Sequence, residues 1–112
     1  MNTARKGSSG ELFAAARLEA MGYVVASRRH IGGAGDLLAI HPNPYQEPPL
    51  GPSLLAEVKA RKNPYEGFRR ADRREMLDTP LPPGGVRYLA VVRGSGDNRS
   101  LEWIDEKSWP AC

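Results

Sequence analysis

Proline is the residue that most constrains this chain, because five prolines and a glycine fall within residues 42–52. Proline fixes its φ angle and lacks the backbone N–H that helices and central strands require. The segment therefore excludes both structures and predicts a surface hairpin loop. Short apolar runs at residues 37–40 and 54–60 lie on either side of it and predict two strands joined by this Pro-rich loop.

Hydrophobic periodicity predicts a first helix upstream of these strands. Ser8 and Glu11 have the S-x-x-E spacing of a capping box, and Gly22 supplies a C-terminal stop. We therefore expect a helix that begins at Ser8, preceded by a flexible basic arm at residues 1–7. The residues expected to face the core are Leu12, Phe13, Ala16 and Ala20.

The rest of the chain completes an α/β pattern in one domain, residues 1–112. A second helix is expected over residues 68–77, with Phe68, Ala71 and Leu77, or Met76 as an alternative, facing inward. Further strands are expected at residues 23–27, 86–92 and 101–104, and Asp105 is expected to cap a last turn that contains Trp109. The order α-β-β-β-α-β-β predicts helices packed on a mixed sheet.

Composition excludes several classes of protein. Cys112 is the only cysteine, so neither an intramolecular disulfide nor a Cys-based zinc site can form, and a free thiol suits a reducing compartment. No apolar run approaches the roughly 18 residues of a membrane span, and residues 1–10 lack the apolar segment of a signal peptide. We expect a cytoplasmic protein with no membrane partner, and surface positions for the isolated His30 and His41.

The charge is unevenly distributed, although its sum is only +3. Residues 57–75 carry seven basic and four acidic side chains, residues 1–34 carry five and two, and residues 97–107 carry two and four. Two basic blocks of this kind form either solvated surfaces or a surface for an anionic partner such as nucleic acid.

Two charged residues interrupt the apolar run at residues 54–60. Glu57 and Lys59 are two positions apart, so in a strand they project from the same face. Charges in an apolar strand are costly unless they are paired or bind a ligand. A hairpin would bring Asp36 alongside them, and two carboxylates beside an ammonium group suit a hard divalent cation such as Mg²⁺.

These residues carry a family resemblance. Gly35-Asp36-Leu37-Leu38-Ala39-Ile40, the twenty residues between Asp36 and Glu57, and Glu57-Val58-Lys59 resemble the signature of PD-(D/E)XK nucleases. Within that superfamily, residues 6–77 are most similar to archaeal-type Holliday-junction resolvases. Bacterial YraN-like proteins share Gly10-Glu11 and the Glu-Val-Lys strand. The chain departs from the resolvase pattern in having Gly35 where proline is usual, in its longer Pro-rich loop, and in lacking a catalytic serine within residues 28–35.

The resemblance implies a restriction-endonuclease-like core and a structure-selective DNA endonuclease that uses Mg²⁺, with Mn²⁺ as a substitute. The substrate would be a four-way DNA junction in recombination and repair, and its two-fold symmetry implies a homodimer. Asp36, Glu57 and the Val58 carbonyl would hold the metal, and Lys59 would serve the attacking water. Glu11 would complete the acidic cluster, or act only as the capping partner of Ser8.

Two alternatives stay open: a nuclease with another DNA substrate, YraN-like or restriction-type, and a non-catalytic nucleic-acid-binding module. Trp103 and Trp109 lie outside the motif, and we expect core or dimer contacts for them rather than base stacking. The residues expected to contact the DNA backbone are Lys6, Arg28, Arg29, Arg61, Lys62, Arg69, Arg70, Arg73 and Arg74.

Overall fold

In the described part of the chain, five strands and two α-helices follow one another in the expected order. The computed structural model of the chain describes residues 2–28 and 35–111. In these two ranges the expected order of elements, α-β-β-β-α-β-β, is confirmed. The elements are α1 (Asn2–Ala20), β1 (Val24–Ser27), β2 (Leu37–Ile40), β3 (Ser53–Lys59), α2 (Arg70–Asp78), β4 (Val86–Arg93) and β5 (Ser100–Asp105).

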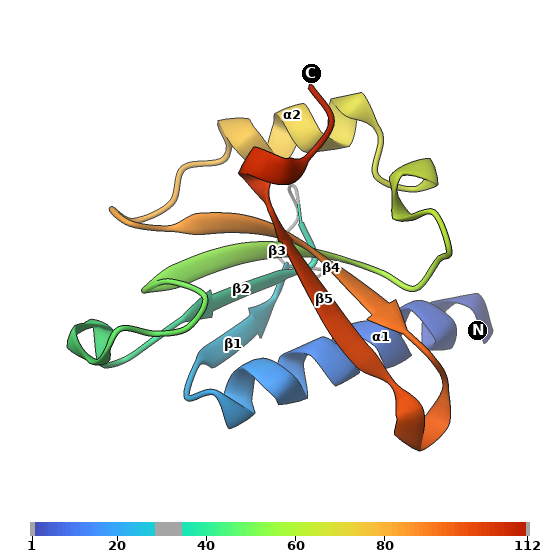
Figure 1. Ribbon diagram of the computed structural model, residues 1–112, viewed down its shortest axis with the longest axis horizontal. Helices are drawn as coiled ribbons and strands as arrows, with labels where there is room; N and C mark the ends of the chain where they lie inside the picture. Colours follow the sequence, from blue (N-terminus) through green and yellow to red (C-terminus); the bar gives the residue numbers. More distant parts are fainter. Residues whose placement is uncertain (1, 29–34, 112) are drawn as a thin grey trace.

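The strands form a single mixed sheet in the order β1-β2-β3-β4-β5. Three neighbouring pairs are antiparallel, and β3 and β4 are parallel, with α2 in the connection between them. Because β2 and β3 pair in antiparallel fashion, the Pro-rich loop is a hairpin connection, as expected. Figure 1 shows α1 on one face of this sheet and α2 on the other. The predicted α/β class with a mixed sheet is therefore confirmed.

The central strand β3 is buried on both faces. Leu54 packs in a cluster on the α1 side, and the next residue, Leu55, packs with Phe68 and Met76 on the α2 side. Leu54, Leu55 and Phe68 are all fully buried. Alternation along the strand therefore assigns each side chain of β3 to one of two cores.

The first helix differs from the expectation in two respects. It begins at Asn2 rather than at Ser8, so residues 2–7 extend the helix and Ser8 cannot be its N-cap. Its buried positions are Gly10, Ala14 and Leu18, while Leu12 is 69% exposed. The chosen stripe was wrong because this alanine-rich helix carries apolar residues on more than one side, and periodicity alone does not identify the side that faces a sheet.

The second helix was also assigned the wrong inner face. Phe68 and Met76 are buried as expected, but Ala71 is exposed and Leu77 is 38% exposed. The inner position between them is taken by Arg73, which is 7% exposed. Its Nη1 donates a 2.8 Å hydrogen bond to the Phe68 carbonyl, so a cation is accommodated where an apolar residue was expected.

The C-terminal turn agrees with the sequence. Asp105 is the N-cap of a 3-10 turn, Glu106–Ser108, and its side chain accepts a hydrogen bond from the Lys107 amide. Trp109 follows this turn, and its ring meets Phe68 edge-on at 4.9 Å between centroids. Among the described residues, no helix is both long and apolar enough to cross a membrane.

The two leucines of α1 provide a direct test of which helix face is buried. Leu18→Ala is expected to lower the free energy of unfolding by about 2–5 kcal/mol, because it leaves a cavity in the core. Leu12→Ala is the matched control on the same helix and should change it by less than about 0.5 kcal/mol. Urea unfolding of both variants measures the difference, and equal losses would contradict the assigned face.

Candidate active site

The pairing of β2 with β3 places Asp36 beside the end of β3. The Asp36 amide donates to the Ala56 carbonyl at 2.8 Å, and its own carbonyl accepts from the Arg28 amide at 2.8 Å. The Asp36 side chain then accepts a 2.8 Å hydrogen bond from the Val58 amide through Oδ2. The carboxylate is thus fixed across the hairpin, at the position where the sequence placed it.

Gly35 makes this approach possible. Its φ is +82°, a conformation that proline cannot adopt and other L residues rarely do. A Cβ at this position would lie 2.7 Å from Leu55 Cδ1, well inside van der Waals contact. The glycine that departs from the family pattern is therefore required by the local backbone of this chain.

Glu57 and Lys59 project from the same face of β3 and form an ion pair. Lys59 Nζ lies 3.0 Å from Glu57 Oε2, and the two side chains are only 23% and 15% exposed, respectively. The pair is half-buried, so it is shielded from the solvent that weakens surface ion pairs. The predicted juxtaposition of these two residues is present in the structure.

The environment of Glu57 disfavours its charged form. Burial, and after it the negative charge of Asp36, raise the pKa of its carboxyl from 4.5 to about 7, against the lowering effect of Lys59. One lysine therefore does not fully compensate two neighbouring carboxylates. An additional cation near these carboxylates would stabilise the charged form of Glu57.

A turn that the sequence reasoning missed supports Lys59 from the other side. In the 3-10 turn Pro64–Glu66, the N-cap Asn63 accepts a hydrogen bond from the Tyr65 amide, and Gly67 follows the turn. A Cβ on Gly67 would lie 3.4 Å from both Cε and Nζ of Lys59. The Asn-Pro-x-x-Gly pattern at residues 63–67 was the available signal for a turn that ends against the lysine.

Glu11 is placed differently from the other acidic residues. The preceding residue, Gly10, packs against the Val58 side chain, which points away from the face that carries Glu57. Among residues 2–28 and 35–111, no three or more His, Cys, Asp or Glu side chains form a group able to hold a metal ion. The structure thus brings together Asp36, Glu57 and Lys59, and Glu11 lies on the α1 layer.

The donor set that remains fits a hard cation. The hydrogen bond to Val58 uses Oδ2 of Asp36, and the ion pair uses Oε2 of Glu57, which leaves Oδ1 and Oε1 as carboxylate ligands. Mg²⁺ is commonly bound by one or two carboxylates, with water and substrate phosphate completing its coordination.

The expected DNA-contacting residues divide into two groups. The prediction that Arg73 contacts DNA is wrong, because Arg73 is buried. Its guanidinium donates a hydrogen bond to the Phe68 carbonyl and lies 5.9 Å from the centre of the Tyr65 ring. Arg28 is half-buried; Arg29 and the Lys6 side chain lie outside what the structure describes. The exposed members, which follow the end of β3 in sequence, are Arg61, Lys62, Arg69, Arg70 and Arg74.

Comparisons with known proteins add no family assignment. No model of a protein family, no curated protein and no solved structure matches this chain.

The raised pKa of Glu57 makes a prediction about stability. The folded state binds the Glu57 proton more tightly than the unfolded chain, so the free energy of unfolding should fall as the pH rises from about 4.5 to about 7. The loss contributed by this one group would be about 3 kcal/mol, present in full above pH 7. Glu57→Gln should remove this pH dependence and be more stable than the wild type at about pH 8.

Urea unfolding at a series of pH values measures this effect. Glu75→Gln, at an exposed carboxylate on α2, is the matched control and should keep the pH dependence of the wild type. If Glu57→Gln and the wild type lose stability in parallel, Glu57 is not the group responsible.

Proposed function

We propose that this protein is a Mg²⁺-dependent, structure-selective DNA endonuclease of the Holliday-junction resolvase type, acting in recombination and repair. The observation that carries the proposal is the convergence of Asp36, Glu57 and Lys59 at the end of two paired strands, with Glu57 only partly compensated. An ion pair that only stabilised the fold would not need a second carboxylate, such as Asp36, that raises the pKa of Glu57. Perturbed groups of this kind are typical of catalytic sites.

Each residue has a chemical role in phosphodiester hydrolysis. Asp36 and Glu57, with the Val58 carbonyl, would hold Mg²⁺, which polarises the phosphate and lowers the pKa of the attacking water. Lys59 is positioned by Glu57 and by Gly67, and its ammonium group would orient that water and stabilise negative charge in the transition state. The water oxygen forms the new bond to phosphorus, and the ester P–O bond breaks as the leaving oxygen gains a proton.

The exposed basic residues support a DNA substrate. Arg61 and Lys62 come directly after β3, and the Arg93 guanidinium holds this segment by donating to both carbonyls at 3.2 Å. Arg69, the N-cap of α2, and Arg70 and Arg74 within this helix are exposed. Contacts from such side chains to phosphates bind the backbone without reading bases, which suits recognition by shape. A homodimer would present two such sites to a two-fold junction, and a cytoplasmic location is proposed with it.

A second candidate function is a non-catalytic nucleic-acid-binding module that keeps this fold. The observation that favours it is the absence of a three-ligand acidic cluster among the described residues. Under this alternative the basic surface would bind DNA, and the Glu57–Lys59 pair would serve only the structure of β3.

Cleavage assays decide between these candidates. Labelled four-way junction, linear duplex and single strands would be incubated with Mg²⁺, Mn²⁺ or EDTA. We expect symmetric junction cuts that require metal, and losses of at least about 100-fold in Asp36→Asn, Glu57→Gln and Lys59→Ala. Glu75→Gln serves as the control and should cleave like the wild type.

The other outcomes are equally informative. Equal cutting of linear duplex would assign a different substrate within the same enzyme class. Tight DNA binding without cleavage under any metal would favour the non-catalytic module. Thermal unfolding with and without Mg²⁺ tests the metal site separately: the cation should raise the Tm of the wild type, and it should do so much less in Asp36→Asn.

A further inference from the structure

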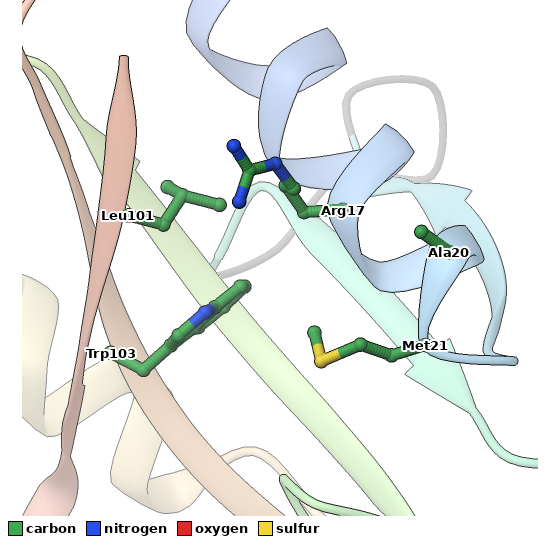
Figure 2. Close-up of a pocket in the computed structure, with 5 residues that line it drawn as sticks. All are labelled: Arg17, Ala20, Met21, Leu101 and Trp103. Atoms are coloured by element: carbon green, nitrogen blue, oxygen red, sulfur yellow. The ribbon is translucent and has the colours of Figure 1, made fainter. Parts of the chain in front are cut away.

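A groove runs between α1 and β5, away from the catalytic residues. α1 packs against β1 to β4, and β5, the last strand of the sheet, crosses over α1 in the view of Figure 1. One cavity, of about 310 Å³, lies at the C-terminal half of α1 and is lined by Arg17, Ala20, Met21, Leu101 and Trp103. In Figure 2, the Trp103 ring and Met21 face each other across this space, and the Arg17 guanidinium extends from α1 toward Leu101.

A second cavity, of about 420 Å³, lies toward the N-terminal half of the helix, and we treat the two as parts of one groove. Its walls include Ser9 and Gly10 of α1, the glycine-rich turn at residues 94–96, and Arg99. Phe13 links one lining residue of each cavity, because the Arg17 and Arg99 guanidinium groups lie 4.9 and 4.4 Å from the centre of its ring. From Ser9 to Ala20 the helix spans about 17 Å, long enough for a short run of nucleotides.

The charge of this groove indicates its occupant. Arg99 donates to the Gly96 carbonyl and to Ser9 Oγ, and Arg17 stacks on Phe13. Neither arginine is paired with a carboxylate of the described residues, and no acidic residue lines either cavity. Two unpaired cations next to a half-buried tryptophan complement a ligand that alternates anionic groups with flat apolar ones, as a nucleic acid strand does.

We propose that the groove between α1 and β5 binds an unpaired strand of nucleic acid, with Arg17 and Arg99 contacting phosphates and Trp103 stacking on a base. Trp103 meets Tyr88 edge-on at 5.8 Å between ring centroids, which holds one edge of the indole while the ring borders the cavity. The core contact expected from the sequence is confirmed, because Trp103 packs against the hydrophobic cluster on the α1 side, and stacking on a base would be an additional role. The groove proposal rests on the proposed nuclease function in one respect, which is the identity of the substrate. That substrate would carry an unpaired strand near the cut.

The position of the groove relative to the catalytic residues supports this reading. Ala60 lines the second cavity, and it directly follows Lys59 of the Glu57–Lys59 pair. The groove therefore opens at the end of β3 that carries the candidate active site, but on the opposite face of the sheet.

Binding measured in EDTA tests the groove without cleavage. The probe is a fluorescein-labelled oligothymidylate of about 10 nucleotides, followed by anisotropy and by quenching of the intrinsic tryptophan fluorescence. Trp109 is 8% exposed, so quenching reports mainly on Trp103. We expect about tenfold weaker binding in Trp103→Ala and loss of the quenching in Trp103→Phe, which preserves packing against Tyr88.

The arginines have a distinct signature. Arg17→Gln and Arg99→Gln should each weaken binding several-fold. Each should also reduce the slope of log affinity against log salt by the amount that corresponds to the loss of about one phosphate contact. Lys107→Gln makes the same charge change at an exposed position in the C-terminal turn and should leave both quantities unchanged within about twofold.

The outcomes separate the groove from the nuclease proposal. Unchanged binding in all three groove variants, or no quenching in the wild type, would overturn the groove assignment whatever the cleavage assay shows. Loss of binding in these variants of a protein that cuts no DNA would support the groove and reject the nuclease. If sedimentation instead shows that Trp103→Ala converts a dimer to monomers while binding is unaffected, the groove is an interface between copies and the proposal is wrong.

Discussion

The antiparallel pairing of β2 with β3 is the constraint on which the rest of the site depends. Its ladder is extended past Leu37 by the Asp36 side chain, which supplies an acceptor for the Val58 amide in place of a backbone carbonyl. A slip of one residue would turn Glu57 and Lys59 toward α1 and away from Asp36. The burial of Leu54 and Leu55 in two separate cores opposes such a slip, so hydrophobic packing determines the geometry of the charged groups.

Much of this arrangement could be predicted from the sequence, because strand periodicity is simple. The two-residue period assigned Glu57 and Lys59 to one face, and the proline content of residues 42–52 identified a hairpin that brings Asp36 alongside. The role of Gly67 was missed because its contact with Lys59 depends on how a turn folds back over the sheet, and not on a local pattern.

The helices were harder to predict for a physical reason. A helix can bury any of several overlapping stripes when alanines and larger apolar residues surround it, and only the shape of the sheet decides between Leu12 and Leu18. Arg73 shows the same limit from the opposite side. The Arg73 guanidinium occupies the inner face of α2 in place of an apolar side chain because it can donate a hydrogen bond to the Phe68 carbonyl. The charge of Arg73 alone had led to the expectation that it would be exposed.

The end of β3 links the two proposed sites. Strand alternation directs Lys59 to the face covered by α2, and the next residue, Ala60, borders the groove beside α1. The sheet itself therefore separates the proposed catalytic residues from the proposed groove, so an unbroken duplex would not enter both. A nucleic acid whose strands diverge at the cut could place one strand on each side of this sheet end. Under the two proposals, branched DNA would be selected by its shape, without any contact that reads sequence.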